Sequence, residues 1–185
     1  MIQISYTFMV IFITVLWLLV RGVVWMKQKN MDWKRELQLL LVYICIIVVV
    51  RFTFCPFGKV DGKIQPLVFY KDNWLNFRIN PIPFVHLFDY VIEREAWLNF
   101  IGNTAMFIPV GIIWPAVYKR LNTPAKVVVA GIGFSVCIEI LQLPFYDRVS
   151  DIDDLILNSL GYLMGYGIYA GVRHMKRKAK SFEDK

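Results

Sequence analysis

The sequence contains little charge, few cysteines and few histidines for its length. Only 19% of its 185 residues are charged and 57% are hydrophobic, whereas a soluble domain has about 25% charged residues. The three cysteines, Cys45, Cys55 and Cys137, lack the spacing of a metal site or a disulfide framework. His86 and His174 lie far apart, and no Ser-His-Asp or Cys-His arrangement is evident. We therefore expect no metal and no cofactor.

Long apolar runs dominate the chain instead. Each run has roughly 18 residues or more, enough to cross a hydrocarbon core of about 30 Å as a helix. The runs are Ile4–Met26, Leu37–Phe57, Trp97–Tyr118, Val127–Tyr146 and Leu155–Val172. They predict an all-α integral membrane protein with five transmembrane helices, the third kinked at Pro109. The first run has neither a basic segment before it nor a small-residue cleavage site after it, so we expect a retained helix rather than a signal peptide.

Lysine and arginine concentrate after the first, third and fifth runs, which share one side of the membrane if the chain crosses it five times. These residues are Lys27, Lys29, Lys34, Arg35, Lys119, Arg120, Lys126, Arg173, Lys176, Arg177, Lys178, Lys180 and Lys185. The positive-inside rule predicts a multi-pass cell-membrane protein with its N-terminus outside and its C-terminus in the cytoplasm. The net charge of +7 fits this topology and does not indicate a nucleic-acid partner.

This topology divides the chain into three parts. Residues 1–36 form an N-terminal transmembrane helix and a cytoplasmic loop, residues 37–172 a membrane domain, and residues 173–185 a basic cytoplasmic tail. The membrane domain includes an extracytoplasmic loop at residues 58–96. We expect the aromatic residues of 67–90 to lie on the outer membrane surface or to cap a polar pocket.

Polar side chains inside the runs gather toward the predicted outer side. Counting about 1.5 Å per residue from the helix ends places them in the outer half of the membrane. They are Arg51, Asn99, Asn103, Glu139, Gln142 and Asn158. The amides are expected either to join helices by hydrogen bonds or to line a cavity for a sugar or amide group, because amides both donate and accept.

Two parts of the chain repeat the same spacing. Residues 51–57 and 139–145 each consist of a charge, four residues and Pro-Phe, while residues 95–102 and 154–161 each consist of an acid, three residues and Asn-x-x-Gly. We infer two helical hairpins related by an axis along the membrane normal.

The repeat makes Arg51 and Glu139 equivalent in position and opposite in charge, which predicts an ion pair between them. Such a pair would either fix the helix register or hold a ligand. In an enzyme, Glu139 would be the catalytic acid or base and Arg51 would hold an anionic group such as phosphate.

The turn before the fifth run carries Asp151, Asp153 and Asp154. Two interpretations stay open: a site for Ca²⁺ or Mg²⁺, or an acidic helix start in which Asp151 is the N-cap and Arg148 an ion-pair partner.

Asp151, Asp154 and Asn158 are spaced at i, i+3 and i+7, and Gly161 and Gly165 continue the same stripe. The glycines form a small-xxx-small surface that favours close packing of another helix.

Several of these residues lie in motifs that resemble the VanZ-like family. The motifs are Asn80-Pro-Ile-Pro83-Phe84, Asn99-Phe-Ile-Gly102-Asn103, Phe107-Ile-Pro109-Val-Gly111, Glu139-Ile-Leu-Gln142, Arg148-Val-Ser-Asp151-Ile-Asp153-Asp154 and Asn158-Ser-Leu-Gly161. The set is specific through its order and spacing on successive membrane segments, and it covers roughly residues 37–172. Pro81 departs from the family, which typically has a hydrophobic residue there.

The resemblance implies a bacterial cell-envelope protein, often Gram-positive, of a family whose founding members are linked to teicoplanin resistance. The family has no agreed reaction, so the resemblance supplies no mechanism. We expect a pocket that binds or modifies a lipid-linked cell-wall component, or a lipoglycopeptide antibiotic, at the outer leaflet. Its substrate-binding residues would be Asn99, Asn103, Gln142, Arg148, Asp151, Asp154 and Asn158.

Two other functions stay open. A small transporter or flippase would use the same polar residues, although they lie on one side rather than at the midplane. A non-catalytic partner of another membrane protein would pack through Gly161 and Gly165. The oligomeric state is not predicted.

Overall fold

The computed structural model describes residues 2–28, 31–55, 59–60, 63–69, 78–84, 93–145 and 148–183. Within these residues lie five helices, each long and apolar enough to cross a membrane, and six short strands. The predicted all-α, multi-pass membrane architecture is therefore confirmed. The helices are α1 (Tyr6–Lys27), α2 (Trp33–Phe54), α3 (Glu93–Val117), α4 (Pro124–Gln142) and α5 (Ile152–Glu183).

Capping side chains set the helix starts. Ser5 Oγ accepts a hydrogen bond from the Phe8 amide at 3.2 Å, and Asp32 Oδ1 accepts from the amides of Lys34 and Arg35 at 3.0 and 3.2 Å. Because Asp32 caps the second helix, α2 begins four residues before the predicted Leu37. At the other extreme, α5 continues well beyond the predicted Val172, so the basic residues after that point remain helical as far as Glu183.

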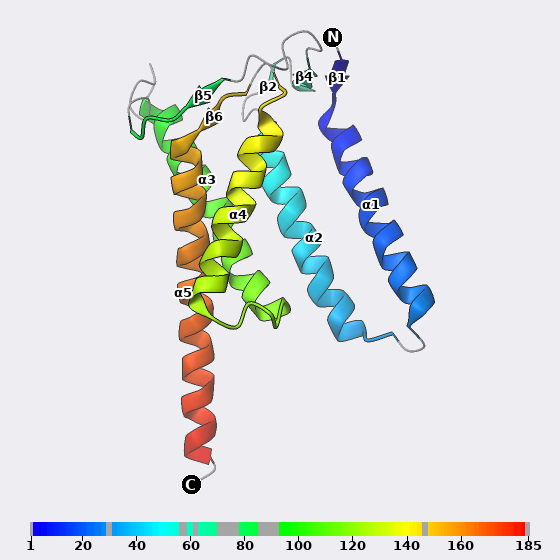
Figure 1. Ribbon diagram of the computed structural model, residues 1–185, viewed down its shortest axis with the longest axis vertical. Helices are drawn as coiled ribbons and strands as arrows, with labels where there is room; N and C mark the ends of the chain where they lie inside the picture. The colour runs from blue at the N-terminus through cyan, green and yellow to red at the C-terminus, as the bar shows by residue number, and fades with distance from the viewer. Residues whose placement is uncertain are drawn as a thin grey trace.

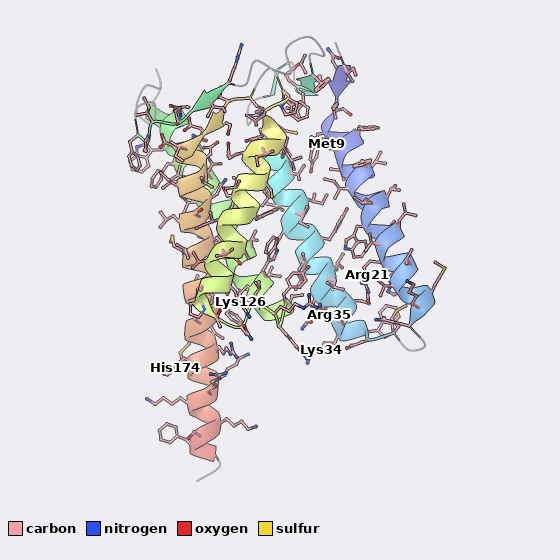
Figure 2. The ribbon with its side chains drawn as sticks, viewed as in Figure 1. Met9, Arg21, Lys34, Arg35, Lys126 and His174 are labelled. Atoms are coloured by element: carbon pink, nitrogen blue, oxygen red, sulfur yellow. The ribbon has the colours of Figure 1, made fainter. Side chains whose placement is uncertain are left out.

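All the strands gather at one end of the helical bundle, together with the N-terminus (Figure 1). We call this the strand end. The α1–α2 and α3–α4 connections lie at the opposite end, and α5 extends beyond them to the C-terminus (Figure 1). That opposite end carries Lys34, Arg35 and Lys126 (Figure 2), and we call it the basic end.

The strands form three short pairs. At the strand end, β1 (Ile2–Ile4) pairs antiparallel with β4 (Leu67–Phe69), and β2 (Lys59–Val60) with β3 (Lys63–Ile64). The third pair is parallel and joins β5 (Ile79–Asn80) to β6 (Ser150–Asp151). This pair brings the loop before α3 against the start of α5.

Helices α3 and α5 pack backbone against backbone. A Cβ atom added at Gly161 would meet the carbonyl oxygen of Thr104, and one at Gly165 would meet the carbonyl oxygen of Ile108. On α3, Gly111 lies equally close to the Tyr162 carbonyl. The predicted role of the glycine stripe in close packing is confirmed, but its partner is α3 of the same chain. These glycines are therefore not an open surface for another protein.

Helix α1 stands at the side of the bundle and contacts α2 (Figure 1). Arg21 forms an ion pair with Glu36 near the basic end, and Tyr43 contacts both Thr14 and Trp17 near the middle. None of its residues is buried, so most of its apolar surface is available to lipid.

Candidate functional site

Four carboxylates gather at the strand end, where α4 ends and α5 begins. They are Glu139, Asp151, Asp153 and Asp154, and we call them the acidic cluster. Glu139 is only 7% exposed. Its Oε2 accepts a hydrogen bond from the Asp151 amide at 3.1 Å, and its carboxylate also bonds to the Ser150 side chain. The negative charges of Asp154 and Asp151 act directly on Glu139.

The amides of α3 meet the acidic cluster from the neighbouring helix. Asn103 Nδ2 donates to Asp154 Oδ1 and also to Asn99 Oδ1, the latter at 3.0 Å. Asn99 forms a side-chain hydrogen bond with Asp154 as well. These two asparagines share a helix face because they are four residues apart. The structure thus brings together Asn99, Asn103 and Asp154, three of the residues proposed from the sequence as substrate-binding.

The β5–β6 pair closes one side of the acidic cluster. Asn80 Nδ2 donates to Asp151 Oδ2 at 3.1 Å, and the Phe84 amide donates to Asp153 Oδ1 at 2.8 Å. Phe84 has a φ of 64°, a left-handed conformation that is rare for a bulky residue. Asp151 also caps α5, because its Oδ1 accepts from the Asp153 amide at 2.9 Å. The N-cap interpretation of Asp151 is confirmed.

Two further predicted residues bind the last carbonyls of α2. Gln142 Nε2 donates to Thr53 O at 2.6 Å, and Arg148 Nη2 donates to Phe54 O at 2.8 Å. These bonds satisfy helix-end carbonyls that have no partner within the helix. The charge of Arg148 also acts on Asp154, so Arg148 links α2 to the acidic cluster.

Cys55 lies at the end of α2 beside these bonds and is 1% exposed. Burial raises the pKa of the Cys55 thiol above its ordinary value, an effect that the nearby Arg51 and Arg148 partly oppose. The protonated thiol is therefore favoured, in line with the absence of a catalytic cysteine pattern.

The predicted ion pair between Arg51 and Glu139 is wrong. Both side chains belong to the described residues, and Glu139 bonds to Ser150 and Asp151 instead. The guanidinium of Arg51 lies 5.6 Å from the ring centre of Tyr6 on α1, and its Nη1 donates to Cys55 O at 3.4 Å. Similar depth did not bring the two residues together because they face different neighbouring helices.

Asn158 is separate from the acidic cluster. It is 1% exposed, and its Nδ2 donates to Ser135 Oγ of α4 at 3.1 Å. One turn further along α5, Tyr162 packs its ring where a Cβ on Gly131 would lie. This part of α5 therefore faces α4, and Asn158 acts as a hydrogen-bond link between helices in this structure.

The three aspartates do not converge on a common point. Asp151 binds Asn80, Asp153 binds the Phe84 amide, and Asp154 binds the amides of α3. Among the described residues there is no group of His, Cys, Asp and Glu that could hold a metal ion. The geometry thus favours the acidic helix start over the cation site.

The structure places three residues beside the acidic cluster that were not predicted from the sequence to be site residues. Asn80 and Ser150 contribute side-chain hydrogen bonds, and Phe84 contributes its amide. Asn80 and Phe84 stand in the motif Asn80-Pro-Ile-Pro83-Phe84, which was the available signal. His86 and the aromatic positions 70–77 and 85–90 lie outside the described residues, as do Pro56 and Phe57 of the repeat.

The chemistry of this end of the bundle is that of an acceptor-rich site. Carboxylates attract ammonium groups and accept hydrogen bonds from hydroxyls and amides, whereas they repel phosphate. Since Arg51 points elsewhere, an anion held beside Glu139 by that arginine is not supported.

The comparisons with known proteins identify a family and no individual relative. Residues 40–173 match the sequence model described as VanZ/LLP1, which covers well over half of the chain. No curated protein and no solved structure matches the chain.

Proposed function

The chain belongs to the VanZ/LLP1 family, and we propose that it contributes to resistance to teicoplanin-type glycopeptides at the outer leaflet of the cell membrane. The acidic cluster and the amides of α3 would bind either a lipid-linked envelope component or the lipophilic antibiotic itself. This proposal includes the orientation from the positive-inside rule, with the strand end outside.

The observation that carries this proposal is the concentration of buried acceptors at the strand end. Glu139 and Asp153 are 7% and 4% exposed, and Asp154 adds a third carboxylate bonded to Asn103. Burying like charges together is costly and must be offset by hydrogen bonds or by a ligand. Such groups within membrane helices commonly mark a functional site.

The ligand chemistry follows from the charges. Sugar hydroxyls, amide N–H groups and ammonium groups all donate hydrogen bonds, and glycopeptides and cell-wall precursors are rich in such donors. A lipid tail on the same molecule would lie against the apolar sides of the bundle. The proposed pocket residues remain Glu139, Asn99, Asn103, Arg148, Asp151 and Asp154.

Binding is supported better than catalysis. The Glu139 carboxylate already accepts hydrogen bonds from Asp151 and Ser150. Glu139 is also only 7% exposed, which restricts the access to a substrate proton that a general base needs. We therefore propose that Glu139 holds the start of α5 in place and contributes negative charge to the binding pocket.

The test is the susceptibility of a sensitive Gram-positive host to teicoplanin and vancomycin. The host would express wild type, Glu139→Gln, Asp154→Asn or the control Asp32→Asn, with membrane levels matched by blot. Asp32→Asn removes one carboxylate at the opposite end, and asparagine still caps a helix. We expect selective protection against teicoplanin from wild type and Asp32→Asn, and its loss in the two cluster variants.

Absence of protection by wild type would disprove the resistance role. Equal protection by wild type and both cluster variants would show that the acidic cluster is structural only.

A further inference from the structure

A cavity of about 730 Å³ opens at the basic end, between the start of α2 and the connection from α3 to α4. Its lining includes Asp32, Lys34, Arg35, Val117, Lys119 and Arg120. We call it the basic cavity. It lies at the opposite end of the bundle from the acidic cluster, so it is independent of the proposed glycopeptide site.

The basic cavity has an excess of positive charge. Its one carboxylate, Asp32, accepts hydrogen bonds from the α2 backbone. Arg35 is also engaged, because its Nη1 donates to Val117 O at 2.6 Å. Lys34, Lys119 and Arg120 form no ion pair with any described carboxylate. Three cationic side chains thus line the cavity against one carboxylate, and none of the three forms an ion pair with a described residue.

An apolar groove adjoins the cations. A second cavity, at the start of α4, shares Lys119 and Arg120 with the basic cavity and continues along Leu121, Ala125, Val129 and Ala130. Val129 belongs to a helix long and apolar enough to span the membrane, and its side chain is 70% exposed, so it is available to lipid. Figure 2 shows Lys126 of α4 at the same level of the bundle as Lys34 and Arg35 of α2. Cations and a lipid-facing apolar surface therefore meet at this place.

We propose that the basic cavity binds the headgroup of an anionic phospholipid, with an acyl chain lying along the apolar groove on α4. The phosphate would be held by Lys34, Lys119 and Arg120, while Arg35 positions the wall of the cavity through Val117 O. Basic pockets between membrane helices suit such headgroups because each cation attracts anionic lipid.

A phospholipid fits better than a soluble phosphate because the groove runs from the cations along the membrane face of α4. A soluble anion would contact only the cationic side chains and would make no contact with Val129 and Ala130 of the adjoining groove. Phospholipid and soluble phosphate both carry a phosphate group, and the binding experiment with both ligands distinguishes them.

The experiment measures binding of phosphatidylglycerol to the purified full-length protein in detergent by native mass spectrometry. Phosphatidylcholine with the same chains and inorganic phosphate serve as comparison ligands. The test variant is Lys34→Gln with Arg120→Gln. The matched control is Arg177→Gln with Lys178→Gln, which removes the same charge from the exposed α5 tail outside the cavity.

We expect the cavity variant to bind phosphatidylglycerol about 10-fold more weakly than wild type, and the tail variant to stay within about 2-fold of it. Phosphatidylcholine should bind weakly to all proteins, and phosphate should not displace the lipid. Equal losses in both variants, equal binding of phosphatidylcholine, or displacement by phosphate would each overturn the proposal.

A second measurement does not depend on the variants being stable. A photoreactive phosphatidylglycerol with its reactive group on the acyl chain should label peptides that contain Val129 in the wild-type protein. Labelling spread evenly over all five membrane helices would contradict a defined site.

Discussion

The amide of Asp151 donates a hydrogen bond to Glu139 Oε2 at 3.1 Å, which joins the start of α5 to the last turns of α4. The same aspartate caps α5 and binds Asn80. One residue thus connects two helices and a loop at the strand end. This connection gives Glu139 a structural as well as a proposed binding role, and the two are separable.

Replacement of Glu139 by alanine should lower the free energy of unfolding more than replacement by glutamine. Alanine leaves the Asp151 amide without its acceptor, at a cost of about 1–3 kcal/mol. Glutamine keeps an acceptor oxygen and removes the charge next to Asp151 and Asp154. Thermal unfolding of both variants in the same detergent measures the difference. Equal destabilisation would show that the hydrogen bond contributes little.

Gly161→Ala should destabilise the protein by about 1–3 kcal/mol, because the added methyl group overlaps the Thr104 carbonyl of α3. Gly167→Ala is the matched control on the same helix, since a Cβ there meets nothing within 4 Å. The control should be neutral or up to about 1 kcal/mol more stable, because alanine favours helix. Chemical unfolding in mixed micelles compares the two, and similar effects would disprove the close α3–α5 contact.

Arg21 and Glu36 should be energetically coupled, whereas Arg51 and Glu139 should not be. Arg21 Nε donates to Glu36 Oε2 at 3.0 Å, and both side chains are only 11% exposed. A double-mutant cycle with Arg21→Met and Glu36→Gln should give a coupling of about 1–3 kcal/mol.

The parallel cycle with Arg51→Met and Glu139→Gln should give less than about 0.5 kcal/mol. Strong coupling in this second cycle would restore the ion pair that the geometry argues against.

The proposed orientation predicts which ends a membrane-impermeant thiol reagent reaches in intact cells. Single cysteines would replace Ile82 at the strand end and His174 on α5, in a background with Cys45, Cys55 and Cys137 replaced by serine. We expect labelling at position 82 in intact cells and at position 174 only after permeabilisation. The opposite pattern would invert the topology and move the acidic cluster to the cytoplasmic side.

The helices were predictable because the membrane imposes a length and a composition on each of them. The spacing of Gly161 and Gly165 was also sufficient to predict close packing, and the acidic turn indicated the Asp151 cap as one of two interpretations. These are local features, within a few turns of one helix, where sequence spacing determines which side chains share a face.

Contacts between distant segments were not predictable from spacing. The repeat placed Arg51 and Glu139 at similar depth but gave no information on the direction in which each helix faces. The pairing of β5 with β6 could not be predicted from the sequence either, because Asn80 and Asp151 are far apart in sequence and each strand has only two residues. Asn80 therefore joins the acidic cluster through tertiary structure alone.

Helix α5 has a mechanical consequence. It runs for 32 residues without interruption, a length of about 48 Å. Asp154 in the acidic cluster and Lys180 near the C-terminus therefore lie on the same continuous helix. A tilt of about 5° at Asp154 would displace Lys180 by about 3 Å. Any tilt of α5 at the strand end would therefore be carried, as one rigid helix, to the basic residues beyond the other end of the bundle.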